Sequence, residues 1–104
     1  MSVFPLRAIF MLSDRFDDAS SPVRILVSVP KKRFKRAVDR NRMKRQIREC
    51  YRLNKQELWQ IAEERKMVVD IAFICITDEP VETMKVARSM RKILGRIVDN
   101  IVES

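Results

Sequence analysis

The alternation of apolar and polar positions predicts two β-strands in the first third of the chain. Residues 3–12 are almost continuously apolar, with Arg7 as the single charge, and are rich in the Ile, Phe and Val that strands favour. Residues 23–29 alternate, so that four aliphatic side chains share one face, which predicts a strand with one buried side. Because only about ten polar residues without periodicity separate the two segments, we expect them to pair as antiparallel neighbours.

The apolar spacing becomes helical after a proline that ends the second strand. Between residues 38 and 53 apolar side chains recur at steps of three to five, and Asp39 suits the positive end of a helix dipole. Asn54 is followed three residues later by Glu57, which is a capping-box pattern. A second short helix, or a continuation of the first, is therefore expected beyond residue 54.

The last third of the chain carries one more strand and one more helix. Residues 67–77 are apolar on both faces, as in a central strand. Residues 81–102 carry an apolar stripe at steps of three and four, with Pro80 in a suitable place for the first turn. The order strand, strand, helix, strand, helix predicts an α+β fold of two layers, with the helices packed on one sheet. We expect a single domain over residues 1–104.

Positive charge is concentrated between residues 31 and 52. This segment holds eleven Lys or Arg and two acidic residues, whereas the other 82 residues hold eleven basic and twelve acidic residues. On the predicted helix, basic residues follow one another at i, i+4 from Arg40 to Arg52, on the face opposite the apolar positions. Like charges at that spacing cost about a few tenths of a kcal/mol per pair. The pattern therefore indicates a polyanionic partner.

We interpret this segment as an RNA-binding surface. A solvated face without a partner, a membrane-surface helix and a helix for a calmodulin-like groove are disfavoured by the charge density and by the commitment of the apolar stripe to the core. A DNA-binding helix is a further alternative. The candidate RNA contacts are Lys31, Lys32, Arg36, Arg40, Asn41, Arg42, Lys44, Arg45, Arg48 and Arg52. A second basic stripe, Arg88, Lys92 and Arg96, fits a secondary RNA contact and a solvated face equally well.

Little in the sequence indicates protein-based catalysis. The chain contains no histidine, the commonest general acid–base and metal-ligating residue. Its adjacent acidic pairs fall in expected loops or on helix surfaces, so we predict no catalytic residue and no metal site in this polypeptide. The two cysteines are expected to be buried, reduced thiols, with a disulfide between them as a minor alternative. No apolar run is long enough to span a membrane. We expect a cytoplasmic protein without a small-molecule substrate. For Tyr51 and Trp59 we favour a packing role over base stacking.

The segment KRAVDRNRMKRQIRECYR resembles the signature of the bacterial ribonuclease P protein component. The resemblance rests on Arg40-Asn41-Arg42, followed at fixed offsets by Lys44-Arg45 and Arg48-Glu49, and preceded by Ala37-Val38. The stretch SVPKK at residues 28–32 is similar to the strand end and lysine pair that lead into the family's basic helix. The order of elements agrees from about residue 3 to the end, so the resemblance covers nearly the whole chain.

The resemblance implies a small mixed sheet with helices packed on it and a left-handed βαβ crossover, against the strong general preference for right-handed ones. It also implies the protein subunit of a ribonucleoprotein endonuclease. In that enzyme an RNA subunit holds the catalytic Mg²⁺ ions and removes the 5′ leader of precursor tRNA. The expected partners are the ribonuclease P RNA, bound by the basic helix, and precursor tRNA, whose leader is expected in a cleft between sheet and helices. A stand-alone RNA-binding module without a role in cleavage is the main alternative, and a protein-only nuclease is disfavoured.

Two features depart from the family pattern. Relatives usually begin with a helix bearing a Phe that walls the leader cleft, whereas this chain starts in the strand that follows. We therefore expect a domain truncated at its N-terminus relative to the family. Many relatives have a glycine just before the basic helix, where this chain has Phe34 and Lys35. Phe34 is expected either to stack on a base or to pack within the fold.

Overall fold

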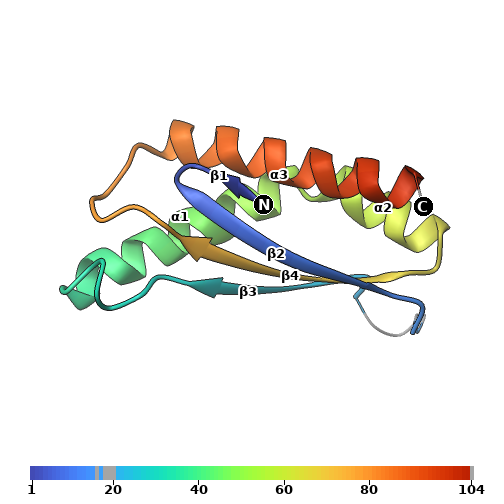
Figure 1. Cartoon of the computed structure of the whole chain (residues 1–104), viewed down its shortest axis with the longest axis horizontal. Coiled ribbons are helices and arrows are strands. Elements are labelled where there is room, and N and C mark those ends of the chain that lie inside the picture. The colour runs from blue at the N-terminus through green and yellow to red at the C-terminus, as the bar shows by residue number, and fades with distance from the viewer. Residues whose placement is uncertain (16, 18–20, 104) are drawn as a thin grey trace.

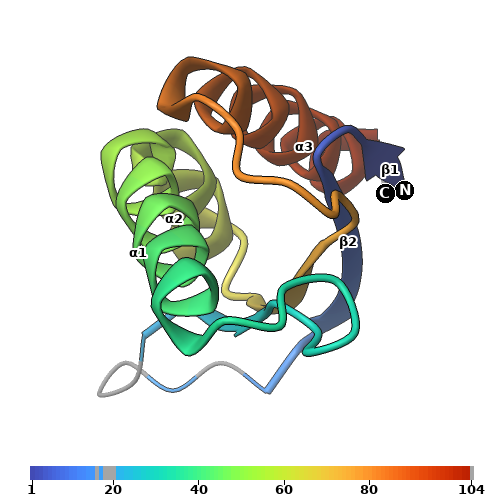
Figure 2. The same ribbon diagram turned by 90° about the vertical axis from the view of Figure 1, so that its left-hand side faces the viewer.

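The computed structural model describes residues 1–15, 17 and 21–103. It is a two-layer α+β sandwich, a sheet with helices on one side (Figures 1 and 2), which confirms the predicted fold class. The elements are β1 (Ser2–Val3), β2 (Leu6–Ser13), β3 (Val23–Ser28), α1 (Ala37–Asn54), α2 (Gln56–Glu64), β4 (Val68–Cys75) and α3 (Thr83–Glu103). Within the described ranges, no helix is long and apolar enough to cross a membrane.

The four strands form one mixed sheet in the order β1-β2-β4-β3. β4 is antiparallel to β2, with Ile71 opposite Phe10, and parallel to β3, with Phe73 opposite Val27. The prediction of a central strand late in the chain is confirmed. The prediction that the first two long strands are antiparallel neighbours is wrong, because β4 lies between them. β4 is apolar on both faces, so the central position covers more of its surface than an edge position would.

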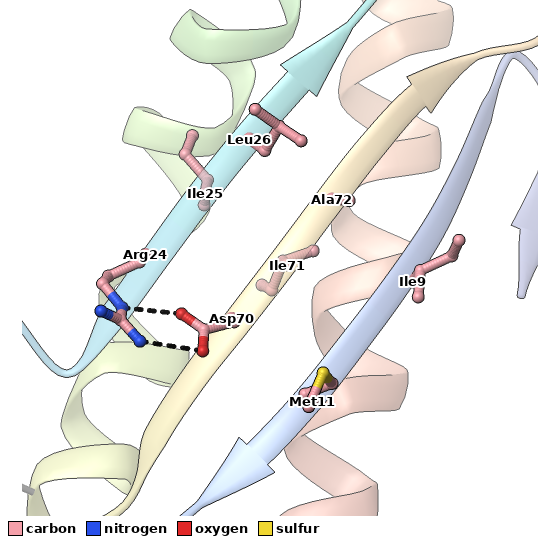
Figure 3. Close-up of a pocket in the computed structure, with 8 residues that line it drawn as sticks. All are labelled: Ile9, Met11, Arg24, Ile25, Leu26, Asp70, Ile71 and Ala72. Carbon is pink, nitrogen blue, oxygen red and sulfur yellow. Dashed lines mark hydrogen bonds and ion pairs between the residues drawn. The ribbon is translucent and has the colours of Figure 1, made fainter. Parts of the chain in front are cut away.

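The crossover from β3 through α1 and α2 to β4 is left-handed. Figure 3 looks onto the sheet from the side without helices. With the parallel strands β3 and β4 pointing toward the top of that view, β4 lies to the right of β3, and the helices lie behind the sheet. Crossovers between parallel strands are right-handed in about 98% of cases. The rare handedness that the family resemblance implies is therefore present.

The helical layer covers one face of the sheet and closes the core against it. α1 and α2 contact β3 and α3, and α3 contacts β1 and β2. The predicted alternation of the second strand is confirmed, because Val23, Val27 and Val29 are buried while Leu26 is exposed. The largest fully buried side chains include Leu6, Met43, Ile47, Leu58, Phe73, Met90, Ile93 and Ile97. The core thus draws on all three helices and on the face of the sheet that they cover.

Two local details differ from the sequence-based expectation. The first predicted strand is a short hairpin, in which a turn at Phe4 and Pro5 separates β1 from β2. The capping box is absent, because the Asn54 side chain donates to the carbonyl of Cys50 at 2.7 Å and no side chain caps α2. Asn54 still belongs to α1, and its amide folds back onto the carbonyl one turn earlier.

Both cysteines lie in the core. Cys50 on α1 and Cys75 on β4 are free thiols and are buried, as the sequence predicts. Burial raises the pKa of each thiol. Neither side chain is therefore placed for thiolate chemistry at neutral pH.

Replacing Ile47 by Ala should lower the free energy of unfolding by about 2–5 kcal/mol, because Ile47 is 0% exposed and its truncation leaves a cavity. Val38→Ala on the same helix is the matched control, because Val38 is 73% exposed and should change the stability by less than about 0.5 kcal/mol. Urea denaturation followed by circular dichroism measures both. Similar losses for the two variants would contradict the packing face assigned to α1.

Candidate nucleic-acid interface

α1 has two unlike faces because its apolar residues recur at helical spacing. Met43, Ile47 and Cys50 are buried at i, i+4 and i+7. Tyr51 extends this stripe to the sheet, where its ring lies 6.0 Å from that of Phe73, centre to centre. Side chains half a turn away from the stripe point out of the core.

The outward side of α1, called here the cationic face, consists of Asn41, Lys44, Arg45, Arg48 and Arg52. Together with Glu49 they line a surface hollow of about 410 Å³. All of them except the half-buried Lys44 are exposed. Five of the ten candidate RNA contacts therefore gather on one open surface.

The protein's own acids neutralise little of the cationic face. Glu49 is its only acidic neighbour in the hollow, and it accepts a hydrogen bond from Arg52 Nε at 3.1 Å. The hydrogen bond with Arg52 lowers the pKa of Glu49, and the one with Glu49 raises the pKa of Arg52, so both stay ionised at neutral pH. Among the described residues, Lys44, Arg45 and Arg48 form no ion pair with an acid. Three of the four cations on this face are thus free for an external anion.

The other five candidate contacts lie around the start of α1. Lys31 and Lys32 are exposed in the turn that follows β3, and Arg36, also exposed, immediately precedes the helix. Arg42 is exposed but does not line the hollow, and Arg40 is half-buried. These residues extend the positive surface toward the N-terminal end of α1.

Arg40 holds the segment that leads into the helix. Its Nη1 atom donates to the carbonyl of Phe34 at 2.8 Å and to that of Lys35 at 3.0 Å. The Phe34 side chain is 4% exposed and belongs to the core cluster. Of the two roles expected for Phe34, packing is the one observed. Arg40 thus has structural partners that hold this segment, and its contact with RNA stays a prediction.

Two polar residues that no local pattern marks hold the basic segment to the rest of the fold. Arg33 pairs with Asp78 after β4, with Nη1 and Oδ1 3.0 Å apart. Gln46 donates from Nε2 to Thr83 Oγ1 at 3.0 Å, which joins α1 to the start of α3. The partners are 45 and 37 residues apart in sequence. Only the tertiary structure could identify these contacts.

Trp59 and Tyr51 couple α2 to α1 at the end of the cationic face. The indole N–H of Trp59 donates to the Tyr51 hydroxyl at 2.6 Å, and burial raises the pKa of that hydroxyl. The ammonium group of Lys55 lies 4.2 Å from the centre of the Trp59 ring. The predicted packing role is confirmed for Tyr51, which is buried. Trp59 is half-buried and packs against the core on part of its surface.

The face of the sheet opposite the helices carries an apolar hollow of about 330 Å³ (Figure 3). Ile9, Met11 and Leu26 line it and are 50%, 69% and 65% exposed. At one end Arg24 donates two hydrogen bonds to the Asp70 carboxylate, at 2.7 and 3.0 Å. The family resemblance implied a cleft between sheet and helices, but packed core side chains fill that space. The open concavity of the sheet is on its other side.

The second basic stripe runs along α3, away from the core. Arg88, Lys92 and Arg96 are exposed at i, i+4, and they form no ion pair with any described acid. A secondary RNA contact and a solvated face both remain compatible with this arrangement.

Replacing Arg40 by Ala should loosen residues 31–36 in the RNA-free protein, because two backbone carbonyls lose a charged donor. Limited trypsin digestion measures this, since the segment contains five Lys or Arg. Cleavage there should accelerate about fivefold, which corresponds to about 1 kcal/mol. Arg45→Ala removes the same side chain from the cationic face and should leave the rate unchanged. Equal digestion of both variants would contradict the positioning role of Arg40.

The chain matches known proteins over nearly its whole length. A family model described as Ribonuclease P matches residues 6–98. The ribonuclease P protein component of Porphyromonas gingivalis strain ATCC 33277 is 46% identical over 102 residues, which cover 98% of this chain and 73% of that protein. The protein of the same name from Idiomarina loihiensis is 66% identical over 35 residues, which cover 34% of this chain and 28% of that protein. No solved structure gives a significant match.

The region matched by the family model begins in β2 and ends in α3. It therefore contains the central sheet pairing, the left-handed crossover and the entire cationic face of α1. The Porphyromonas gingivalis relative extends the similarity to almost every residue of the chain. The chain belongs to the ribonuclease P protein family.

Proposed function

We propose that this chain is the protein subunit of a bacterial ribonuclease P and works in the cytoplasm. In this proposal the cationic face of α1 binds the RNA subunit of the enzyme. That RNA removes the 5′ leader of precursor tRNA and leaves a mature 5′ end. The observation that carries the proposal is a row of exposed cations on α1 with a single acidic partner among the described residues, in a chain that belongs to the ribonuclease P protein family.

The side chains of the cationic face are suited to the RNA backbone. The guanidinium groups of Arg45 and Arg48 can each donate two hydrogen bonds to one phosphate, and the Lys44 ammonium supplies a mobile point charge. Asn41 adds a group that both donates and accepts. Two polyanions, the RNA subunit and the precursor tRNA, repel each other, and a concentrated positive surface lowers that repulsion.

We place the 5′ leader on the open face of the sheet. The exposed Ile9, Met11 and Leu26 offer apolar surface to unpaired bases. Arg24 lies at the edge of this hollow with part of its charge satisfied by Asp70. Recognition of single-stranded RNA commonly combines such apolar contacts with nearby positive charge. This assignment replaces the cleft between the two layers, which the core occupies.

The proposal places the Mg²⁺ ions required for cleavage on the RNA subunit. Within the described residues, no group of three His, Cys, Asp or Glu side chains could hold a metal ion. The roles proposed for this chain are binding and orientation, and no bond-breaking step is assigned to its side chains.

Binding to the RNA subunit should depend steeply on salt. If about six phosphates are neutralised, the affinity should fall about a thousandfold between 50 and 200 mM salt. Arg45→Ala should lower the slope of log affinity against log salt by about one, because one phosphate contact is lost. Arg65→Ala removes an exposed cation at the end of α2 and should leave the slope unchanged. Fluorescence anisotropy of labelled RNA gives the slopes, and an unchanged slope for Arg45→Ala would count against the assignment.

Reconstitution tests the proposed function itself. A bacterial ribonuclease P RNA and precursor tRNA are mixed with the protein at low Mg²⁺, and 5′ leader release is followed on a gel. The protein should stimulate cleavage, and the double variant Arg45→Ala, Arg48→Ala should stimulate it at least tenfold less, since each lost charge-assisted contact is worth about 1.5 kcal/mol.

Arg65→Ala is the matched control for charge and should stimulate cleavage as the unchanged protein does. RNA binding without stimulation would favour the alternative, a stand-alone RNA-binding module. Cleavage in the absence of the RNA subunit would instead make the protein itself the nuclease. Either result would overturn the proposed role.

A further inference from the structure

A second hollow, called here the tryptophan hollow, continues the cationic face around the junction of α1 and α2. It has a volume of about 450 Å³. Its lining residues are Arg52, Leu53, Lys55, Gln56, Trp59, Gln60 and Glu63. Arg52 also lines the hollow of the cationic face, so the two concavities share a wall. Arg52 is paired with Glu49, so a strand whose phosphates lie along α1 reaches the tryptophan hollow by passing this one ion pair.

The Trp59 ring is held in a fixed orientation. Its only polar atom, the indole nitrogen, donates to the hydroxyl of Tyr51 at 2.6 Å. Tyr51 is itself buried and packs against Phe73 of the central strand. Because the N–H is already satisfied, the ring offers an incoming ligand its aromatic surface and no free hydrogen-bonding group. Such a preset platform loses little conformational entropy on binding.

The ammonium group of Lys55 lies against the exposed side of the Trp59 ring, and an incoming base can take its place there. Lys55 lies with its Nζ 4.2 Å from the ring centre, and it forms no ion pair with any described acid. A cation–π contact at a solvated site is weak. The same ammonium would bind a phosphate more strongly than a ring. The base of an incoming nucleotide could thus stack on the Trp59 ring while its phosphate pairs with Lys55.

The rim of the hollow suits a base and not a second polyanion. Leu53 is 66% exposed beside Trp59, which leaves apolar surface that a flat ring would cover. Gln56 and Gln60 bring side-chain amides that can donate to and accept from base edges. Glu63 on the same rim opposes a phosphate at that point. The chemistry changes from phosphate-binding to base-binding across Arg52.

We propose that the tryptophan hollow binds one unpaired RNA base, which stacks on Trp59 while the neighbouring phosphates lie on the cationic face. This inference rests on the proposed function, since it needs an RNA on α1. It adds a base-stacking site next to a surface that by itself recognises only phosphate. Unpaired bases in loops and bulges stack on aromatic side chains in this way. The expected ligand is therefore a single-stranded or bulged nucleotide.

The test uses the emission of Trp59, which is the only tryptophan of the chain. The intact protein is titrated with single-stranded oligouridylate, with oligoadenylate, and with inorganic polyphosphate of matched length, which has phosphates but no bases. Both RNAs should quench the emission at saturation, because a stacked base quenches an indole. Polyphosphate should bind the cationic face and leave the emission nearly unchanged. Equal quenching by polyphosphate would overturn the stacking site.

The anisotropy of labelled RNA, followed in parallel, separates this inference from the proposed function. RNA that binds without altering the emission of Trp59 overturns the stacking site alone. RNA that does not bind at all overturns both. The expected result is a rise in anisotropy that coincides with the loss of emission.

A variant pair then separates stacking from folding. Trp59→Leu should weaken oligoadenylate binding about tenfold and leave polyphosphate binding unchanged, because only the RNA loses a stacked base. Trp59→Phe keeps a ring, although it lacks the donor to Tyr51, and should bind RNA within a few-fold of the original protein. A loss of stability that disturbs α1 would weaken the binding of oligoadenylate and of polyphosphate equally. If each variant lost affinity for oligoadenylate and for polyphosphate by the same factor, the proposal would be contradicted.

Discussion

The structure depends on the balance between repulsion on one side of α1 and apolar burial on the other. Arg40, Lys44, Arg48 and Arg52 form three successive i, i+4 pairs, which together cost about 1 kcal/mol in an isolated helix. Burial of a single side chain such as Ile47 contributes about 1.5–3 kcal/mol. The helix therefore forms because the core holds it. The repulsion remains on its outer face, where the proposed RNA partner would relieve it.

The same packing makes the cationic face a preorganised surface. α1 is attached along its length, with Arg33 and Arg40 holding the segment before it, Gln46 joining it to α3, and Tyr51 meeting both the sheet and Trp59. A helix attached in this way loses little further freedom when it binds. Its cations are already arrayed at the spacing of the helix, so binding an anion carries little cost in conformational entropy. This rigidity links the hydrophobic core directly to the proposed RNA binding.

The layered fold separates surfaces of different chemistry. The helical layer bears the cationic face and, at the junction of α1 and α2, the aromatic and amide groups of the tryptophan hollow. The uncovered side of the sheet is mainly apolar, with one ion pair between Arg24 and Asp70. In the proposed function, the RNA subunit lies on the helical layer and the 5′ leader on the open side of the sheet. An RNA subunit and a leader could occupy these surfaces at the same time, because the core lies between them.

Features set by residues close in sequence could be predicted from the sequence alone. The cationic face, the buried faces of α1 and α3, and the central position of β4 follow from spacing and apolarity, because a helix or strand places neighbouring residues in a known direction. The family signature also lies in one helix and could be identified there. That these residues contact RNA stays a prediction, whereas their position on one exposed face is observed.

Features that depend on which distant segment covers a given face were decided only by the tertiary structure. An apolar pattern shows that a side must be buried but does not name its partner. For this reason β4 could insert between β2 and β3, and the core could fill the space where a cleft was expected. For a polar side chain with several available partners, the local sequence pattern likewise could not predict which hydrogen bond forms. Arg33 paired with Asp78 and Gln46 bonded to Thr83 because the completed fold brought these partners, 45 and 37 residues away, within reach. Asn54 instead turned back to the Cys50 carbonyl of its own helix.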